Sequence, residues 1–90
     1  MPYIVEDRRS IIDKSLESVD VFDEGDLNYH ITKICSKYIE NNGMRYKHLN
    51  AVIGALECAK LEMYRRVAAT YEHEKMKENG DVYNKLLNMI

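Results

Sequence analysis

Residues 46–79 read YKHLNAVIGALECAKLEMYRRVAATYEHEKMKEN and form the longest helical pattern of the chain. Asn42-Gly43 precedes this stretch and Gly80-Asp81 follows it, and it contains no proline. At 1.5 Å per residue the helix would extend about 50 Å, whereas two shorter patterns, Glu6 to Val19 and Asp26 to Glu40, would each reach about 20 Å. Two short helices cannot cover a long one and also enclose a core. The sequence therefore predicts a single all-α domain over residues 1–90 that assembles as a helical homo-oligomer.

The shorter elements follow the same helical periodicity. One face of the first helix is apolar through Ile12, Leu16 and Val19. An acidic loop is expected before Asp26, which is expected to cap the second helix. That helix repeats apolar residues at Leu27, Ile31, Ile34, Cys35, Tyr38 and Ile39, and Asn41-Asn42-Gly43 ends it. Beyond Gly80, the spacing of Val82, Leu86, Leu87 and Ile90 predicts a short docking helix.

The long helix carries two stripes of side chains. One predicts a core face and contains Leu49, Val52, Ile53, Leu56, Met63 and Val67, interrupted by Lys60. The other follows steps of seven through Asn50, Glu57, Tyr64 and Tyr71, interleaved with Gly54, Leu61 and Ala68. A mixed line of this kind suits a helix–helix contact, where small residues permit close approach and an asparagine sets the register. It suits equally well a cleft in which a few polar groups orient a small ligand.

Composition narrows the class of protein. Hydrophobic residues make up 46% and charged residues 31% of the 90 residues, which favours a folded chain over a disordered one. The net charge of -2 provides no general attraction to nucleic acid or to anionic lipid. The charged start MPYIVEDRRS does not resemble a signal peptide, and no apolar run reaches membrane-spanning length. We therefore expect a cytoplasmic protein that binds no membrane and is unlikely to bind nucleic acid.

No pattern predicts catalysis, a metal or a cofactor. Cys35 and Cys58 occupy apolar helical positions and are expected to be buried free thiols. A zinc site would need more ligands than these two thiols and the scattered histidines, His30, His48 and His73. His30 and Cys35 are five residues apart, which turns them away from each other on one helix. Without a glycine-rich phosphate loop or a nucleophile motif, we expect a non-enzymatic protein with no catalytic residues, metal or cofactor.

Tyr64, Arg65 and Arg66 are the strongest candidates for ligand binding. Guanidinium groups bind phosphates in a bidentate manner and stack on aromatic rings, so this run suits a nucleotide-like ligand. The simpler interpretation is that the arginines form surface ion pairs with Glu62, Glu72 and nearby acids. Tyrosines on predicted helices usually pack in a core with the hydroxyl at its rim. A ligand role for Tyr29 or Tyr71 becomes attractive if such hydroxyls converge with Asn28, Asn50 or Arg65.

The chain resembles a family of small helical proteins without assigned function, found mainly in tailed phages and prophages. The matching segments are MPYI at 1–4, LNYHITKICSKYI at 27–39 and LNAVIGALECAKLEMYRRVAATYEHEKMKENGDVY at 49–83. The resemblance implies that LNY, LECAKLE, YRR, YE and NGDVY are motif positions. Thr70 stands where similar sequences often have proline, which suggests a straighter long helix, and His73 stands where they often have aspartate. The residues after Tyr83 look like an extension.

The phage resemblance suggests a function only by analogy, because phages use small oligomeric proteins to sequester nucleotide signals of bacterial immunity. The leading hypothesis is an anti-defence sponge that binds a phosphate-bearing ligand in pockets between subunits, in the host cytoplasm if the gene is phage-encoded. Its ligand-binding residues would be Tyr64, Arg65, Arg66, Asn28, Tyr29, Asn50 and Tyr71. The alternative is an adaptor or inhibitor that presents a helix face to a host or phage enzyme.

Overall fold

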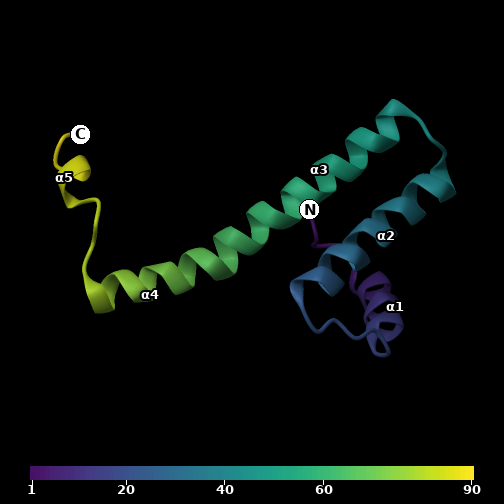
Figure 1. Ribbon diagram of the computed structural model, residues 1–90, viewed down its shortest axis with the longest axis horizontal. Coiled ribbons are helices and arrows are strands. Elements are labelled where there is room, and N and C mark those ends of the chain that lie inside the picture. The colour runs from purple at the N-terminus through teal and green to yellow at the C-terminus, as the bar shows by residue number, and fades with distance from the viewer. The chain divides into compact units, whose positions relative to one another are not determined.

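The computed structural model describes all residues from 1 to 90, and every regular element in it is helical. In chain order the elements are α1 (Glu6–Leu16), α2 (Glu24–Asn42), α3 (Tyr46–Met63), the π-helical segment η1 (Tyr64–Ala68), α4 (Ala69–Asn79) and α5 (Asn84–Leu87) (Figure 1). The chain divides into two units, Met1–Glu57 and Cys58–Ile90, which are described separately below. The predicted all-α class is confirmed. None of the helices combines the length and the apolar composition that crossing a bilayer requires.

Helix α1 ends at Leu16, three residues before the predicted end at Val19. The backbone N–H of Glu17 donates to the carbonyl of Lys14 at 3.3 Å, and that of Val19 donates to the carbonyl of Leu16 at 3.0 Å. Both bonds span three residues instead of four, so the chain tightens and leaves the α-helix. The apolar spacing could not reveal this, because Val19 keeps its sequence position whether or not the backbone is helical.

Helix α2 is longer at both ends than predicted, and its cap is Asp23, so the prediction that Asp26 caps it is wrong. The Asp23 carboxylate accepts the backbone N–H of Asp26 at 2.7 Å. In return, the Asp26 carboxylate accepts the backbone N–H of Phe22 at 3.3 Å. This reciprocal arrangement needs two acidic residues three positions apart, a spacing that the acidic loop provides.

Replacing the capping residue, Asp23→Ala, should lower the free energy of unfolding by about 1 kcal/mol, because one backbone donor of the first turn loses its partner. Urea unfolding followed by helical circular dichroism measures the effect. Asp20→Ala is the matched control, since it removes the same charge from the same loop without touching a cap. An equal loss in both variants would show that the charge of the loop matters and the cap does not.

Within the first unit, α2 and the first turns of α3 form a helical hairpin (Figure 1). Gly43 ends α2 with a φ of 105°, and its N–H donates to the carbonyl of Ile39 at 2.7 Å. Across the hairpin the rings of Tyr38 and His48 meet edge to face, with centroids 6.2 Å apart. The His48 ring also lies within hydrogen-bond distance of the Gly43 carbonyl, 2.8 Å from its Nδ1 atom. The predicted glycine stop of α2 is therefore confirmed.

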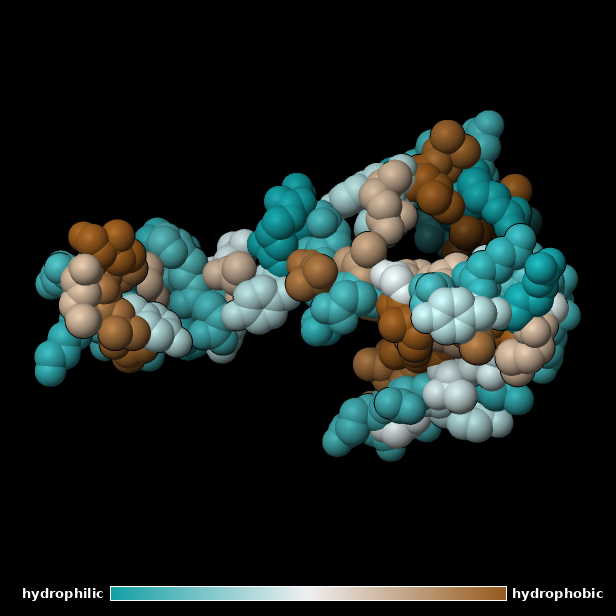
Figure 2. All heavy atoms as spheres, turned by 90° about the horizontal axis from the view of Figure 1, so that it is seen from above, coloured by the Kyte–Doolittle hydropathy of each residue, from teal (hydrophilic) through white to brown (hydrophobic).

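No side chain of the chain is buried, so the predicted core face is not a core within one chain. Val52 is half-buried in the hairpin, whereas Leu49, Ile53 and Leu56 are exposed. Apolar side chains lie open at the surface of the part that holds α1 and α2 and around α5 (Figure 2). Cys35 and Cys58 are free thiols, the first half-buried and the second exposed, so neither is buried as expected.

The predicted long helix begins at Tyr46 and ends at Asn79 in the structure, but its hydrogen bonding is not regular. In η1 the N–H of Ala69 donates to the carbonyl of Tyr64, five residues back. A π-helical turn of this kind contains one residue more than an α-helical turn. Near this turn, the Thr70 hydroxyl donates to the Arg66 carbonyl at 3.2 Å.

Candidate functional site

The structure places the seven predicted ligand-binding residues on four elements, and all of their side chains are exposed. In the first unit, Asn28 and Tyr29 lie on α2 and Asn50 lies on α3. In the second unit, Tyr64, Arg65 and Arg66 lie in η1, and Tyr71 lies on α4.

The three residues of the first unit do not meet. The contact of Tyr38 with His48 sets the register of the hairpin and puts Asn50 opposite position 36 of α2. Asn28 lies eight positions earlier, about 12 Å along the helix at 1.5 Å per residue. Locally, the Asn28 carbonyl accepts the Thr32 hydroxyl at 2.9 Å, and the Lys33 ammonium lies 5.9 Å from the centre of the Tyr29 ring.

The two arginines of η1 differ in their surroundings. Arg65 donates to the Glu62 carboxylate at 2.6 Å, an ion pair of the kind that the simpler interpretation predicts. The Arg65 side chain is 66% exposed and that of Glu62 is 24% exposed, so the pair lies at the surface. The Arg66 side chain is exposed and takes part in no ion pair. Of the two guanidinium groups, Arg66 therefore needs less rearrangement to meet an anion.

The π-helical turn changes which residues share a face with Tyr64. In a regular α-helix, residues seven positions apart lie on nearly the same face. One extra residue rotates all later residues by about 100°, so that residues eight positions apart share a face instead. Tyr71 is seven positions after Tyr64 and Glu72 is eight. In agreement, Glu72 lines a pocket together with Tyr64, and Tyr71 does not. The predicted stripe at steps of seven therefore does not continue from Tyr64 to Tyr71.

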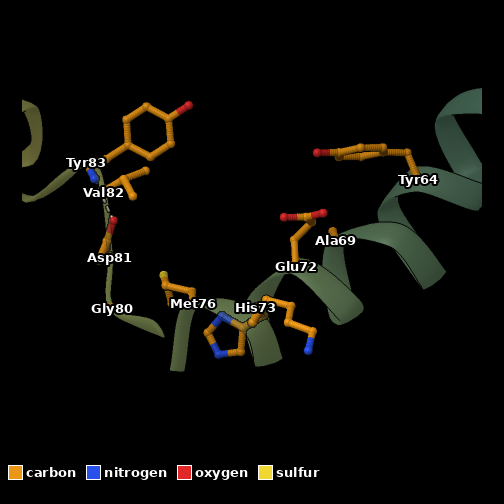
Figure 3. Close-up of a pocket in the computed structure, with 10 residues that line it drawn as sticks. Tyr64, Ala69, Glu72, His73, Met76, Gly80, Asp81, Val82 and Tyr83 are labelled. Atoms are coloured by element: carbon orange, nitrogen blue, oxygen red, sulfur yellow. Dashed lines mark hydrogen bonds between the residues drawn. The ribbon is translucent and has the colours of Figure 1, made fainter. Parts of the chain in front are cut away.

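This pocket has a volume of about 440 Å³ and lies wholly within the second unit. It is lined by Tyr64, Ala69, Glu72, His73, Lys75, Met76, Gly80, Asp81, Val82 and Tyr83. Tyr64 and Tyr83 lie on opposite sides of the space, and the Glu72 carboxylate points into it between them (Figure 3). The His73 ring points away from the two tyrosines in this view.

A bend of the chain after α4 forms the second wall of the pocket. Gly80 has a φ of 95°, and its N–H donates to the carbonyl of Met76 at 2.8 Å, which ends the helix. The Asp81 carboxylate then accepts the N–H of Tyr83 at 2.7 Å and closes an Asx turn. This turn holds Val82 and Tyr83 against the pocket. The predicted short helix follows as α5, whose Leu86 and Leu87 are exposed.

The pocket is aromatic and acidic in character. Glu72 takes part in no ion pair, and neither Arg65 nor Arg66 lines the pocket. The one lysine that lines the pocket, Lys75, contacts other residues, since its ammonium lies 3.1 Å from the Glu78 carboxylate and 5.6 Å from the centre of the Tyr71 ring. Residue type and spacing did not single out Glu72 and Tyr83 as candidates for this pocket. The signal for them lay in the YE and NGDVY motifs.

A second pocket, of about 350 Å³, is a groove on the hairpin of the first unit. We call it the hairpin groove, and it is lined by Ile34, Cys35, Tyr38, Ala51, Val52 and Ala55. None of these residues is charged, and the two alanines lie four positions apart on α3. A helix face with small residues at this spacing allows close approach of another helix. The hairpin groove therefore has the character of a packing surface.

Comparison with known proteins identifies a family for this chain. No curated protein and no solved structure is significantly similar to the chain. Residues 1–82 match a family described as a domain of unknown function (DUF6899). That match covers most of the 90 residues, including Tyr64, Glu72 and Asp81. The chain is therefore a member of the family described as a domain of unknown function, DUF6899.

Proposed function

We propose that this chain is a non-enzymatic binding protein that acts as a homo-oligomer and sequesters a phosphate-bearing, nucleotide-derived signal between its subunits. The observation that carries the proposal is that the chain buries none of its apolar side chains. Folded chains of this size normally depend on apolar burial to offset the entropy of ordering the backbone. A second copy, which presents the same apolar surfaces, supplies that burial.

The exposed apolar residues of the hairpin groove and its surroundings favour self-association. Ile34 is 62% exposed, and Ile53 on α3 is 65% exposed. Burying each of these side chains would contribute about 1 to 2 kcal/mol. Several such contacts on each protomer are enough to stabilise an assembly at micromolar concentration, which requires about 8 kcal/mol.

The ligand class is supported by the side chains of η1. Arg66 is an exposed guanidinium without an ion pair, which is the group best suited to a phosphate. Arg65 can also bind the phosphate if it leaves its exposed ion pair with Glu62. An exposed pair of this kind contributes at most about 1 kcal/mol to stability. Tyr64 offers an aromatic ring beside them. The anti-defence role that we propose for the protein rests on the phage resemblance and is an analogy.

Titration calorimetry against cyclic dinucleotides and ADP-ribose derivatives tests this proposal. We expect at least one of them to bind the oligomer, and we expect Arg66→Gln to weaken that binding about tenfold because a charged hydrogen bond to phosphate is lost. Arg45→Gln is the matched control, since it removes the same charge from the turn before α3. A folded oligomer that binds no member of the panel would argue strongly against sequestration.

The hairpin groove favours one alternative function, which is a protein–protein adaptor or inhibitor. An apolar groove between two helices suits an amphipathic helix of a partner. A pull-down from infected cells separates the two functions. A single stoichiometric host or phage protein supports the adaptor, whereas a nucleotide released from the purified protein by heating supports the sponge.

A further inference from the structure

The pocket of the second unit combines the Glu72 carboxylate with two aromatic rings, and its one lysine is paired with a residue outside the pocket. Glu72 points into the space between Tyr64 and Tyr83 and has no ion-pair partner (Figure 3). Lys75, the only lysine along the pocket, is directed to Glu78 and to the Tyr71 ring. The charge of the Glu72 carboxylate is therefore not neutralised from within the chain.

Such a combination matches one chemical class of ligand. A carboxylate forms charge-assisted hydrogen bonds with ammonium and guanidinium groups. The faces of tyrosine rings attract the same cations through their quadrupole. Met76 and Val82 add apolar surface along the pocket, against which a short carbon chain can pack. The volume of about 440 Å³ falls within the range of pockets that hold small molecules.

We propose that this pocket binds a primary ammonium or guanidinium group carried on a short apolar stem. Glu72 would pair with the positive charge of the ligand, and the rings of Tyr64 and Tyr83 would contact the same cation. Met76 and Val82 would pack against the apolar stem. The pocket shares Tyr64 with the proposed phosphate site but uses neither Arg65 nor Arg66. It requires no second copy of the chain, because all of its lining residues belong to one unit. A free amine or a lysine or arginine side chain of a partner would supply the same group.

Titration of the full-length chain with agmatine and with 1,4-diaminobutane, followed by NMR, tests the inference. We expect saturable shifts at the Met76 methyl group and at the Tyr64 and Tyr83 rings. The neutral analogue 1,4-butanediol should cause none. Glu72→Gln should weaken amine binding about fivefold, which corresponds to the upper end for an exposed charge pair. Tyr64→Leu should weaken it about threefold through loss of the ring.

The matched control is Glu74→Gln, which removes the same charge from the same helix. Glu74 lies outside the pocket and pairs with Lys77 at 3.6 Å. Amine binding should be unchanged in this variant. Equal weakening by Glu72→Gln and Glu74→Gln would overturn the proposal, because it would show a general attraction to an acidic surface. Shifts that do not saturate, or equal binding of the diol, would overturn it as well.

The source of the cation is tested with the same readout. Nα-acetyl-lysine amide and Nα-acetyl-arginine amide present the cationic group as a protein partner would, whereas agmatine presents it as a free small molecule. Tighter binding of either kind supports the site and identifies the source. Failure of all these cations to bind would overturn the inference and would leave the phosphate titrations with Arg66→Gln unaffected, so the two proposals fail separately.

Discussion

Ile34→Asp is expected to dissociate the proposed homo-oligomer. Ile34 is 62% exposed on α2 and lines the hairpin groove, so a copy packed on that groove would cover it. An unpaired carboxylate in an apolar contact costs about 3 kcal/mol or more, which weakens association about a hundredfold. Sedimentation velocity of the wild-type chain and the variant over a range of concentrations measures the change in assembly.

Thr32→Asp is the matched control for this experiment. Thr32 is exposed on the same helix, two positions away and on another face, and it does not line the groove. This variant adds the same charge and should assemble as the wild type does. If the wild-type chain itself sediments as a stable folded monomer at low concentration, the proposed assembly is wrong. The ligand pockets between subunits would then be wrong as well.

Gly43→Ala should lower the free energy of unfolding of the first unit by about 1 to 3 kcal/mol. Gly43 has a φ of 105° and lies where α2 reverses into α3, a conformation that side-chain-bearing residues rarely adopt. An added Cβ would meet no atom within 4 Å, so the cost comes from the backbone alone. Thermal and urea unfolding followed by circular dichroism measures it, and amide exchange should locate the loss in the hairpin.

Gly54→Ala makes the same substitution inside α3, where an added Cβ also meets no atom within 4 Å. In a helix interior, alanine is preferred over glycine by about 0.5 to 1 kcal/mol. We therefore expect Gly43→Ala to lower the free energy of unfolding and Gly54→Ala to raise it. A destabilised Gly54→Ala variant would mean that another helix packs closely on that position, while a Gly43→Ala variant as stable as wild type would contradict the backbone argument.

Several features of the site were predictable from local spacing, and others were not. Both ends of the long helix at Tyr46 and Asn79 followed from the glycines and asparagines that flank it. The ion pair of Arg65 with Glu62 followed from their three-residue spacing on a helix. The π-helical turn did not follow, because hydrogen bonds that reach five residues back leave no mark on hydrophobic periodicity. That turn brings Glu72, in place of Tyr71, to the face of Tyr64.

The sequence by itself determined the helical class, the ends of the longest helix and the exposure of a large apolar surface, since these depend on local spacing and on chain length. The pocket between Tyr64 and Tyr83 was decided only by the structure. It depends on where the backbone leaves the α-helical path, at the π-helical turn and after Gly80. That choice is made by competing hydrogen bonds of similar free energy, and the order of residue types does not resolve it.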